Sequence, residues 1–157
     1  MPTNAEKALE SLQKTIGQAG PPSEWLEIDQ DRINQFADAT LDHQFIHVDP
    51  ERAKSTPWGK TIAHGFLTLS LIPHLAKMVD SDSPLEGAMM GVNYGLDKVR
   101  FISPVPVDSR VRGVTELVEA RLVDPNTVQM KSRITVEIEG NDKPACVAEQ
   151  IGRTYFS

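Results

Sequence analysis

The sequence predicts one α+β domain in which an antiparallel sheet wraps around a helix, and two observations support this prediction. An apolar helix is expected over residues 65–79, and strands are expected through the second half of the chain. A helix that is apolar on nearly every side is normally buried on every side. A sheet curled around the helix would bury it, and 157 residues are the length of one domain.

The N-terminal residues are predicted to form a helix outside the main domain. Leu9, Leu12 and Ile16 are three and four residues apart, which predicts a short helix over residues 4–19. One glycine and two prolines at 20–22 end it. We therefore expect a helical arm over residues 1–22 and a main domain over residues 23–157.

Two aspartates mark the next helix starts, after an extended piece around residues 25–28. Asp29 is a plausible N-cap for a helix that ends near Ala39. Asp49 followed by Pro50 predicts a second N-cap, with proline at the first helical position. Residues 40–48 are therefore expected to form a loop between two helical pieces, where functional side chains often lie.

The helix over residues 65–79 is expected to be kinked at Pro73. The clearest strand follows later, where apolar residues from Val128 to Ile138 alternate with polar ones, a pattern typical of a sheet with one solvated face. One sheet around one helix leaves edge strands open, so we expect a second copy of the chain to pair with it. The strands are expected at 88–102, 110–122, 128–138 and 144–156.

Composition excludes several classes of protein. The net charge of −6 and the 6% aromatic content do not suit a general nucleic-acid binder, which normally carries a basic stripe. One cysteine, Cys146, cannot make an internal disulfide. The N-terminal residues lack the pattern of a signal peptide, and the most apolar stretch is too interrupted to span a membrane. We expect a soluble cytoplasmic protein without a nucleic-acid or membrane partner.

The candidate chemistry lies in two short segments, residues 42–47 and 62–66. Phosphate-loop, dinucleotide and nucleophile-elbow motifs are lacking, so no cofactor is expected. Asp42 and His47 could reach one water molecule as an acid–base pair, because imidazole accepts protons near neutral pH. The alternative is a turn aspartate beside a histidine that only packs.

A metal site is a competing interpretation of the same residues. His43 and His47 are four residues apart, which places two imidazoles on one helix face, and Asp42 or His64 could complete the site. Pro50 follows too closely for a full helical turn to be expected there, however. We therefore expect no metal here.

Gly65 is the second candidate feature. If the apolar helix starts there, the first amides are among its unpaired N–H groups and could stabilise a developing oxyanion. Glycine would also let a carbonyl group approach the backbone closely. An ordinary glycine at a helix start explains the sequence equally well.

These segments resemble a known family. Residues 36–49, FADATLDHQFIHVD, and residues 62–67, IAHGFL, resemble the hydratase motif of MaoC-like (R)-specific enoyl-CoA hydratases, and the QFIH variant is most similar to their NodN-like branch. Residues 98–107, KVRFISPVPV, are similar to a later segment of that family. The resemblance covers about residues 24–157.

The resemblance implies a hot-dog fold and syn addition of water to a trans-2-enoyl thioester. It implies that Asp42 and His47 activate the water and protonate C2, while the Gly65 amide polarises the thioester carbonyl. Gln44, His64 and Phe66 are then expected to bind the substrate. Many family members have Asn-Pro where this chain has Gln-Phe at 44–45, and some use a serine where Pro73 stands. These departures concern the substrate range and the rate more than the Asp42/His47 pair.

The expected assembly is a homodimer that binds acyl-CoA or an acyl-carrier thioester. Two alternatives stay open: a hot-dog acyl-CoA thioesterase, and a non-catalytic acyl-ligand-binding or signalling module. Because CoA is anionic and the chain is acidic, a local basic patch is also expected. Its members are expected among Lys54, Lys60, Lys98, Arg100 and Arg110.

Overall fold

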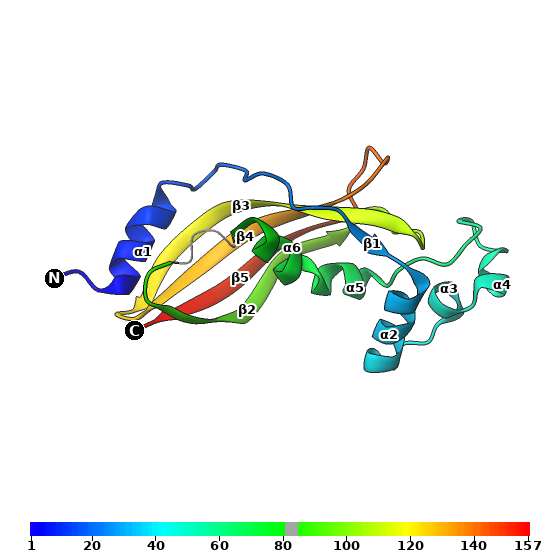
Figure 1. Ribbon diagram of the computed structural model, residues 1–157, viewed down its shortest axis with the longest axis horizontal. Coiled ribbons are helices and arrows are strands. Elements are labelled where there is room, and N and C mark those ends of the chain that lie inside the picture. Colours follow the sequence, from blue (N-terminus) through cyan, green and yellow to red (C-terminus); the bar gives the residue numbers. More distant parts are fainter. Residues whose placement is uncertain (81–84) are drawn as a thin grey trace.

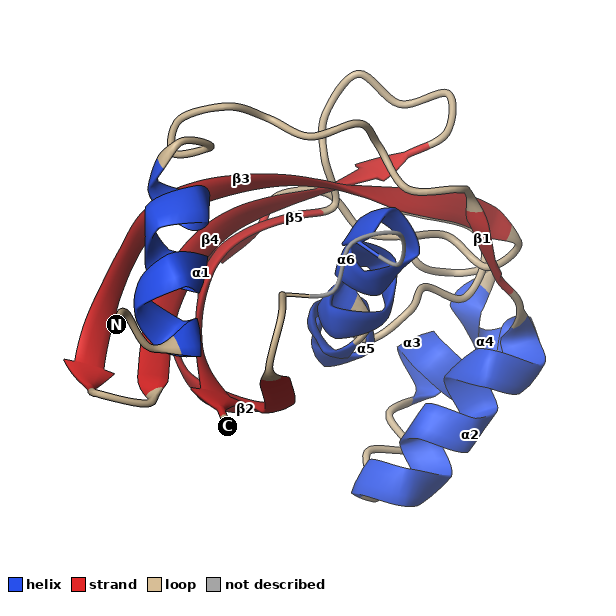
Figure 2. Cartoon of the chain, turned by 60° about the vertical axis from the view of Figure 1, so that its left-hand side comes forward, coloured by secondary structure: helices blue, strands red, loops and turns tan. Residues whose placement is uncertain are grey.

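In the computed structural model, a five-stranded antiparallel sheet curls around a helix that is broken into two pieces (Figures 1 and 2). This is the hot-dog arrangement, and it confirms the predicted α+β class. The structure describes residues 1–80 and 85–157, and the description excludes the side chains of residues 77–80. Among the described residues, no helix is both long and apolar enough to cross a membrane.

The sheet has the strand order β1-β3-β4-β5-β2, and every neighbouring pair is antiparallel. All four strands predicted in the second half are present, and the extended piece before the first long helix forms a short edge strand. The other edge is β2, whose residues are mostly exposed. The strands span Leu26–Ile28 (β1), Ala88–Phe101 (β2), Ser109–Asp124 (β3), Thr127–Ile138 (β4) and Cys146–Phe156 (β5).

The central helix consists of α5 (Gly65–Ser70) and α6 (Ile72–Asp80). The helix is interrupted just before Pro73, where a kink was predicted. Proline has no N–H group to donate to the helical hydrogen bonds. Leu75 packs close to the sheet, and a Cβ built on Gly113 of β3 would lie 3.1 Å from the Leu75 Cβ atom. Glycine at this position therefore allows α6 to approach the sheet.

The prediction that this helix is buried on every side was wrong. Leu67, Ile72 and Leu75 are buried, but Phe66 is 66% exposed and His74 is exposed. The sheet covers only the face of the helix that it curls around. Met78 and Val79 were also expected to be buried, and their side chains lie outside the part that the structure describes.

The N-terminal helix α1 (Asn4–Gln13) lies on the same concave face as the central helix, at the far end of the sheet (Figure 2). It ends earlier than the predicted residue 19. Thr3 and Glu6 form a capping box at its start. Ala5 and Ala8 are buried against Val128 and Phe156. The boundary between arm and main domain after residue 22 stays a prediction.

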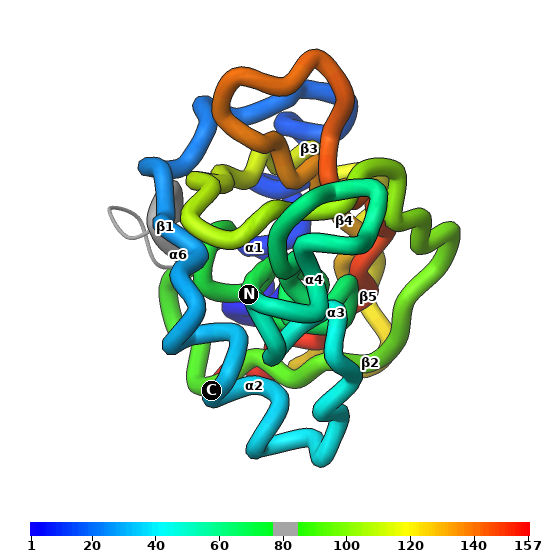
Figure 3. Tube along the Cα trace, turned by 90° about the vertical axis from the view of Figure 1, so that its right-hand side faces the viewer, coloured from blue at the N-terminus to red at the C-terminus, as the bar shows by residue number. Residues whose placement is uncertain are grey.

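Three helices lie at the opposite end of the sheet (Figure 1), the end that faces the viewer in Figure 3. Asp29 and Asp49 cap two of them, accepting hydrogen bonds from the Arg32 and Arg52 amides at 2.9 and 3.1 Å, as predicted. The expected loop at 40–48 was wrong in part, because residues 45–48 form a helical turn. The helices are α2 (Gln30–Thr40), α3 (Phe45–Val48) and α4 (Pro50–Ala53).

Candidate active site

His47 lies in α3 and is 7% exposed. Its Nδ1 lies 2.7 Å from the Ile62 carbonyl oxygen. A carbonyl only accepts hydrogen bonds, so Nδ1 carries the proton in the neutral ring and Nε2 keeps its lone pair. The fold therefore holds His47 in the tautomer that can accept a proton at Nε2.

Gln30 is a part of the site that the sequence analysis missed. Its Nε2 donates to the His47 carbonyl oxygen at 2.7 Å, and its Oε1 accepts from the Thr61 hydroxyl at 2.6 Å. Gln30 thereby joins α2, α3 and the segment before α5. The sequence did hold one signal for Gln30. It lies on the same helical stripe as Ile33 and Ala37, which are both buried.

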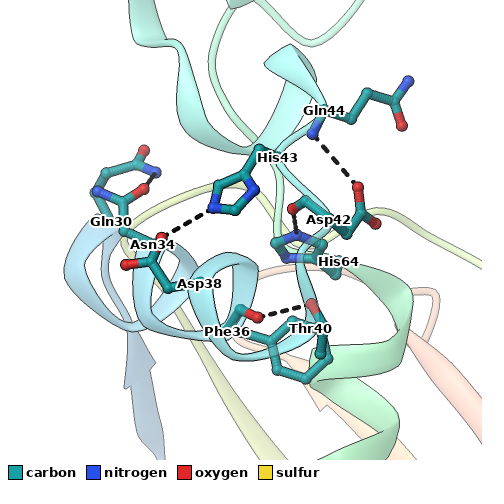
Figure 4. Close-up of polar contacts among 9 residues, drawn as sticks. All are labelled: Gln30, Asn34, Phe36, Asp38, Thr40, Asp42, His43, Gln44 and His64. Atoms are coloured by element: carbon teal, nitrogen blue, oxygen red, sulfur yellow. Dashed lines mark hydrogen bonds and ion pairs between the residues drawn. The ribbon is translucent and has the colours of Figure 1, made fainter.

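His64 connects the two members of the predicted acid–base pair. Its ring stacks on the His47 ring, with centroids 3.8 Å apart and planes 23° apart. Its Nε2 lies 3.0 Å from the Asp42 carbonyl oxygen, so Nε2 carries the proton (Figure 4). His64 is 2% exposed, and within the described part of the chain its Nδ1 has no hydrogen-bond partner.

Asp42 lies just after the end of α2, where Leu41 has a φ of 65° and turns the chain. Its carboxylate accepts a hydrogen bond from the Gln44 amide at 3.3 Å. Asp42, His47 and His64 each offer an atom within 4.8 Å of the others'. The structure therefore places Asp42 and His47 close together, and their catalytic role stays a prediction.

Burial lowers the pKa of His47 below its usual value, and the nearby His64 lowers it further. The hydrogen bond with Ile62 and the charge of Asp42 oppose this change without reversing it. His47 is therefore neutral at neutral pH, which is the state that a general base requires.

The same three residues are poorly arranged for a metal ion. The lone pairs of imidazole nitrogens lie in the ring planes, and the His47 and His64 planes are nearly parallel. The lone pairs of two stacked rings are therefore roughly parallel and do not converge on one metal position. His43, the other candidate ligand, instead pairs with Asp38 at 2.9 Å. That no metal binds here stays a prediction.

Gly65 begins α5, and its first amides have no partner within the helix. A cavity of about 310 Å³ lies beside it, lined by His47, Gly65 and Thr68 together with Phe101 and neighbouring residues. A Cβ built on Gly65 would lie 3.1 Å from the Phe101 ring. Glycine thus leaves room between the helix start and this ring.

The other two predicted substrate-binding residues, Phe66 and Gln44, do not line this cavity. Phe66 is exposed and packs edge-on against Phe101, with ring centroids 5.8 Å apart. Gln44 precedes α3, and its side chain extends away from His64 (Figure 4).

Three of the five cations proposed for a CoA-binding patch already face carboxylates. Lys54 lies 3.0 Å from Glu51, Lys98 lies 3.5 Å from Glu149, and Arg110 pairs with Glu139. Within the described residues, Lys60 and Arg100 have no carboxylate within ion-pair distance. The basic patch stays a prediction, and these two residues are its best candidates.

The chain is similar to known proteins in sequence and in fold. Residues 11–139 match the family model described as the MaoC like domain. The chain is 49% identical to 3-hydroxyacyl-thioester dehydratase Z of Mycobacterium tuberculosis, covering 94% of this chain and 95% of the relative. It is 47% identical to nodulation protein N of Rhizobium meliloti, covering 97% and 94%. The R-hydratase PhaJ1 from Pseudomonas aeruginosa shares the fold, with a TM-score of 0.66, 22% identity and coverage of 90% and 83%.

Proposed function

The chain belongs to the MaoC-like dehydratase family, and we propose that it reversibly hydrates trans-2-enoyl-CoA to (R)-3-hydroxyacyl-CoA. The observation that carries the proposal is the meeting of Asp42 with a neutral His47 whose Nε2 lone pair is available. The name of the mycobacterial relative describes a dehydratase of 3-hydroxyacyl thioesters, which is the reverse direction of the same reaction.

Asp42 and His47 would carry the proton transfers. Water bonds through its oxygen to C3 of the enoyl group, and His47 Nε2 accepts a proton from that water. Asp42 holds the water, and the pair delivers a proton to C2 on the same face. One water molecule is thereby added across the C2–C3 double bond. General acid–base catalysis of this kind contributes roughly 10²- to 10⁴-fold to a rate.

The Gly65 amide would stabilise the negative charge that develops on the thioester oxygen during this addition. His64 would support binding by holding the Asp42 backbone and the His47 ring in place. Phe66 and Gln44 stand as candidate substrate contacts at the outside of the site. The acyl chain would lie beside α5 and α6, where further cavities follow the helix.

We propose a homodimer formed through the β2 edge. An unpaired edge strand offers its backbone groups to another strand, and an exposed apolar edge invites such pairing. A second copy would also cover the open side of the central helix and complete the walls of the site. The large apolar residues exposed along β2 are Met89, Met90, Val92, Tyr94, Leu96 and Phe101, at 46–63%.

The direct test incubates the purified protein with crotonyl-CoA and analyses the product by chiral chromatography. The proposal predicts (R)-3-hydroxybutyryl-CoA with no release of free thiol. Thiol release would identify a thioesterase, since a hydratase leaves the thioester intact. Tight acyl-CoA binding without turnover at any chain length would identify a binding module, and either result would refute the proposal.

A further inference from the structure

A row of polar side chains crosses the concave face of the sheet, between two apolar clusters. On this face of β4, Ser132 is flanked by Met130 on one side and Ile134 on the other. Ser132 pairs directly with Gln150 of β5. Thr115 of β3 is diagonal to Ser132, because its own partner is Ile134. Thr115, Ser132 and Gln150 form what we call the polar row.

The polar row separates two distinct parts of the interior. The cluster on the side of Ile134 contains residues of α5 and α6. The other cluster contains Ala5 and Ala8 of α1, which lies on the same concave face (Figure 2). Neither helix covers the row completely. The direct partner of Ser132 on β3 is Leu117, so the row steps diagonally from β3 to β4. Interior faces of strands are normally apolar, so polar side chains on three adjacent strands require a reason.

Three contiguous cavities lie over this row, with volumes of about 400, 340 and 310 Å³. The first and second share Pro73 and Gln150, and the second and third share Thr115 and Ser132. Leu12, at the end of α1, lines the third. The cavities therefore run from α6 to the N-terminal arm, and the polar row forms their floor.

The first cavity lies along the helix that begins at the candidate active site. It is lined by Leu69 and Ser70 of α5, and Gly65, the first residue of α5, lines the cavity beside His47. From Gly65 to Pro73 the helix rises about 12 Å, at 1.5 Å per residue. A group bound over the row is therefore remote from the reacting carbons and belongs to the distal part of an acyl chain.

The hydrogen-bonding capacity of the row is largely unused. Within the described residues, Gln150 donates to Asn93 at 3.0 Å, and no side-chain hydrogen bond of the Thr115 or Ser132 hydroxyl is found. A plain alkyl tail would displace water from these hydroxyl groups and leave them unpaired, which is unfavourable. A tail with its own hydroxyl or carbonyl group would replace the water.

We propose that the polar row binds an oxygen-bearing group on the distal part of the acyl chain. The protein then prefers thioesters of hydroxylated or oxo-substituted acyl chains over plain chains of equal length. This inference rests on the proposed function for the identity of its ligand as an acyl thioester. A few placed polar groups in an otherwise apolar pocket are the usual source of such selectivity.

The test measures binding by titration calorimetry with saturated, unreactive thioesters. The probes are octanoyl-, decanoyl- and dodecanoyl-CoA, each compared with its ω-hydroxy counterpart. Every pair carries the same CoA, so a difference within a pair arises from the tail. We expect the wild type to bind at least one ω-hydroxy probe about 3- to 10-fold more tightly than its plain partner, the range of one net hydrogen bond.

The variant Thr115→Val/Ser132→Ala should lose this preference, and Thr115→Val alone, which is nearly isosteric, should reduce it. Thr135→Val is the matched control, because Thr135 lies on the same strand as Ser132 and, by alternation, on the opposite face. Equal or tighter binding of all plain probes by the wild type, or an unchanged preference in the double variant, would overturn the inference. Crotonyl-CoA hydration, measured in parallel, tests the proposed function alone, because binding selectivity does not depend on turnover.

Discussion

Replacing His64 by phenylalanine tests whether this residue positions both members of the Asp42/His47 pair. Phenylalanine keeps a ring of similar size against His47 but removes the donor that lies 3.0 Å from the Asp42 carbonyl oxygen. His64→Gln is the complementary variant, because its amide nitrogen can still reach that carbonyl while the aromatic stack is lost. The two variants together separate the hydrogen bond from the ring contact.

The expected effect is large on catalysis and small on stability. Asp42 is exposed, so water can replace the lost bond, and the free energy of unfolding should change by about 1 kcal/mol or less. Displacement of a catalytic group by about 1 Å can cost about 10²-fold in rate. We therefore expect His64→Phe to lower kcat for crotonyl-CoA by about 10- to 100-fold, and His64→Gln to retain more activity.

The assay follows the loss of enoyl absorbance during crotonyl-CoA hydration across a range of pH, with thermal unfolding measured on the same samples. His64 contributes to the lowered pKa of His47, so its removal should also move the acid limb of the kcat profile to higher pH. A kcat within about twofold of wild type in His64→Phe, with an unmoved acid limb, would refute the positioning role.

Three further predictions concern the pH profile, the helix start and the sheet edge. Because the pKa of His47 is lowered in the folded state, activity should fall only below the usual histidine range. Stability measured by urea unfolding should also be lost as pH falls from 6.5 toward that lowered pKa, and a flat profile would argue against a buried neutral His47. Gly65→Ala should lower kcat/KM about tenfold, because its Cβ would displace the Phe101 ring, and Gly65→Ala/Phe101→Leu should recover part of the loss. Met90→Lys/Val92→Lys should turn dimers into monomers by light scattering, whereas retained dimers would place the interface elsewhere.

The parts of the fold that depend on local chemistry were predictable. Asp29 and Asp49 cap helices through bonds to amides three residues away, so the sequence alone specifies them. The alternation in β4 also specifies which side chains face the interior, because its period is fixed by the strand backbone. Pro73 interrupts the central helix for an equally local reason.

The parts that depend on distant contacts were not predictable. The turn that carries His47 is held by Ile62 and Gln30, which are 15 and 17 residues away along the chain. Short helices gain little from their own sequence, so such contacts decide whether they form. Phe66 was expected to be buried because the helix is apolar on nearly every side. Tertiary packing, however, decides which face of the helix is covered, and Phe66 is exposed.

The spacing of Asp42 and His47 left open whether they act as an acid–base pair. The family resemblance assigned them that role, and their role as a catalytic pair is the central claim. The most direct measurement compares kcat for crotonyl-CoA hydration in Asp42→Asn, His47→Ala and His43→Ala. His43 is the matched control, because it is an exposed imidazole near the site that pairs with Asp38. The account predicts losses of about 10²- to 10⁴-fold in the first two variants and a change within about twofold in the third. Near-wild-type hydration by both Asp42→Asn and His47→Ala would contradict it.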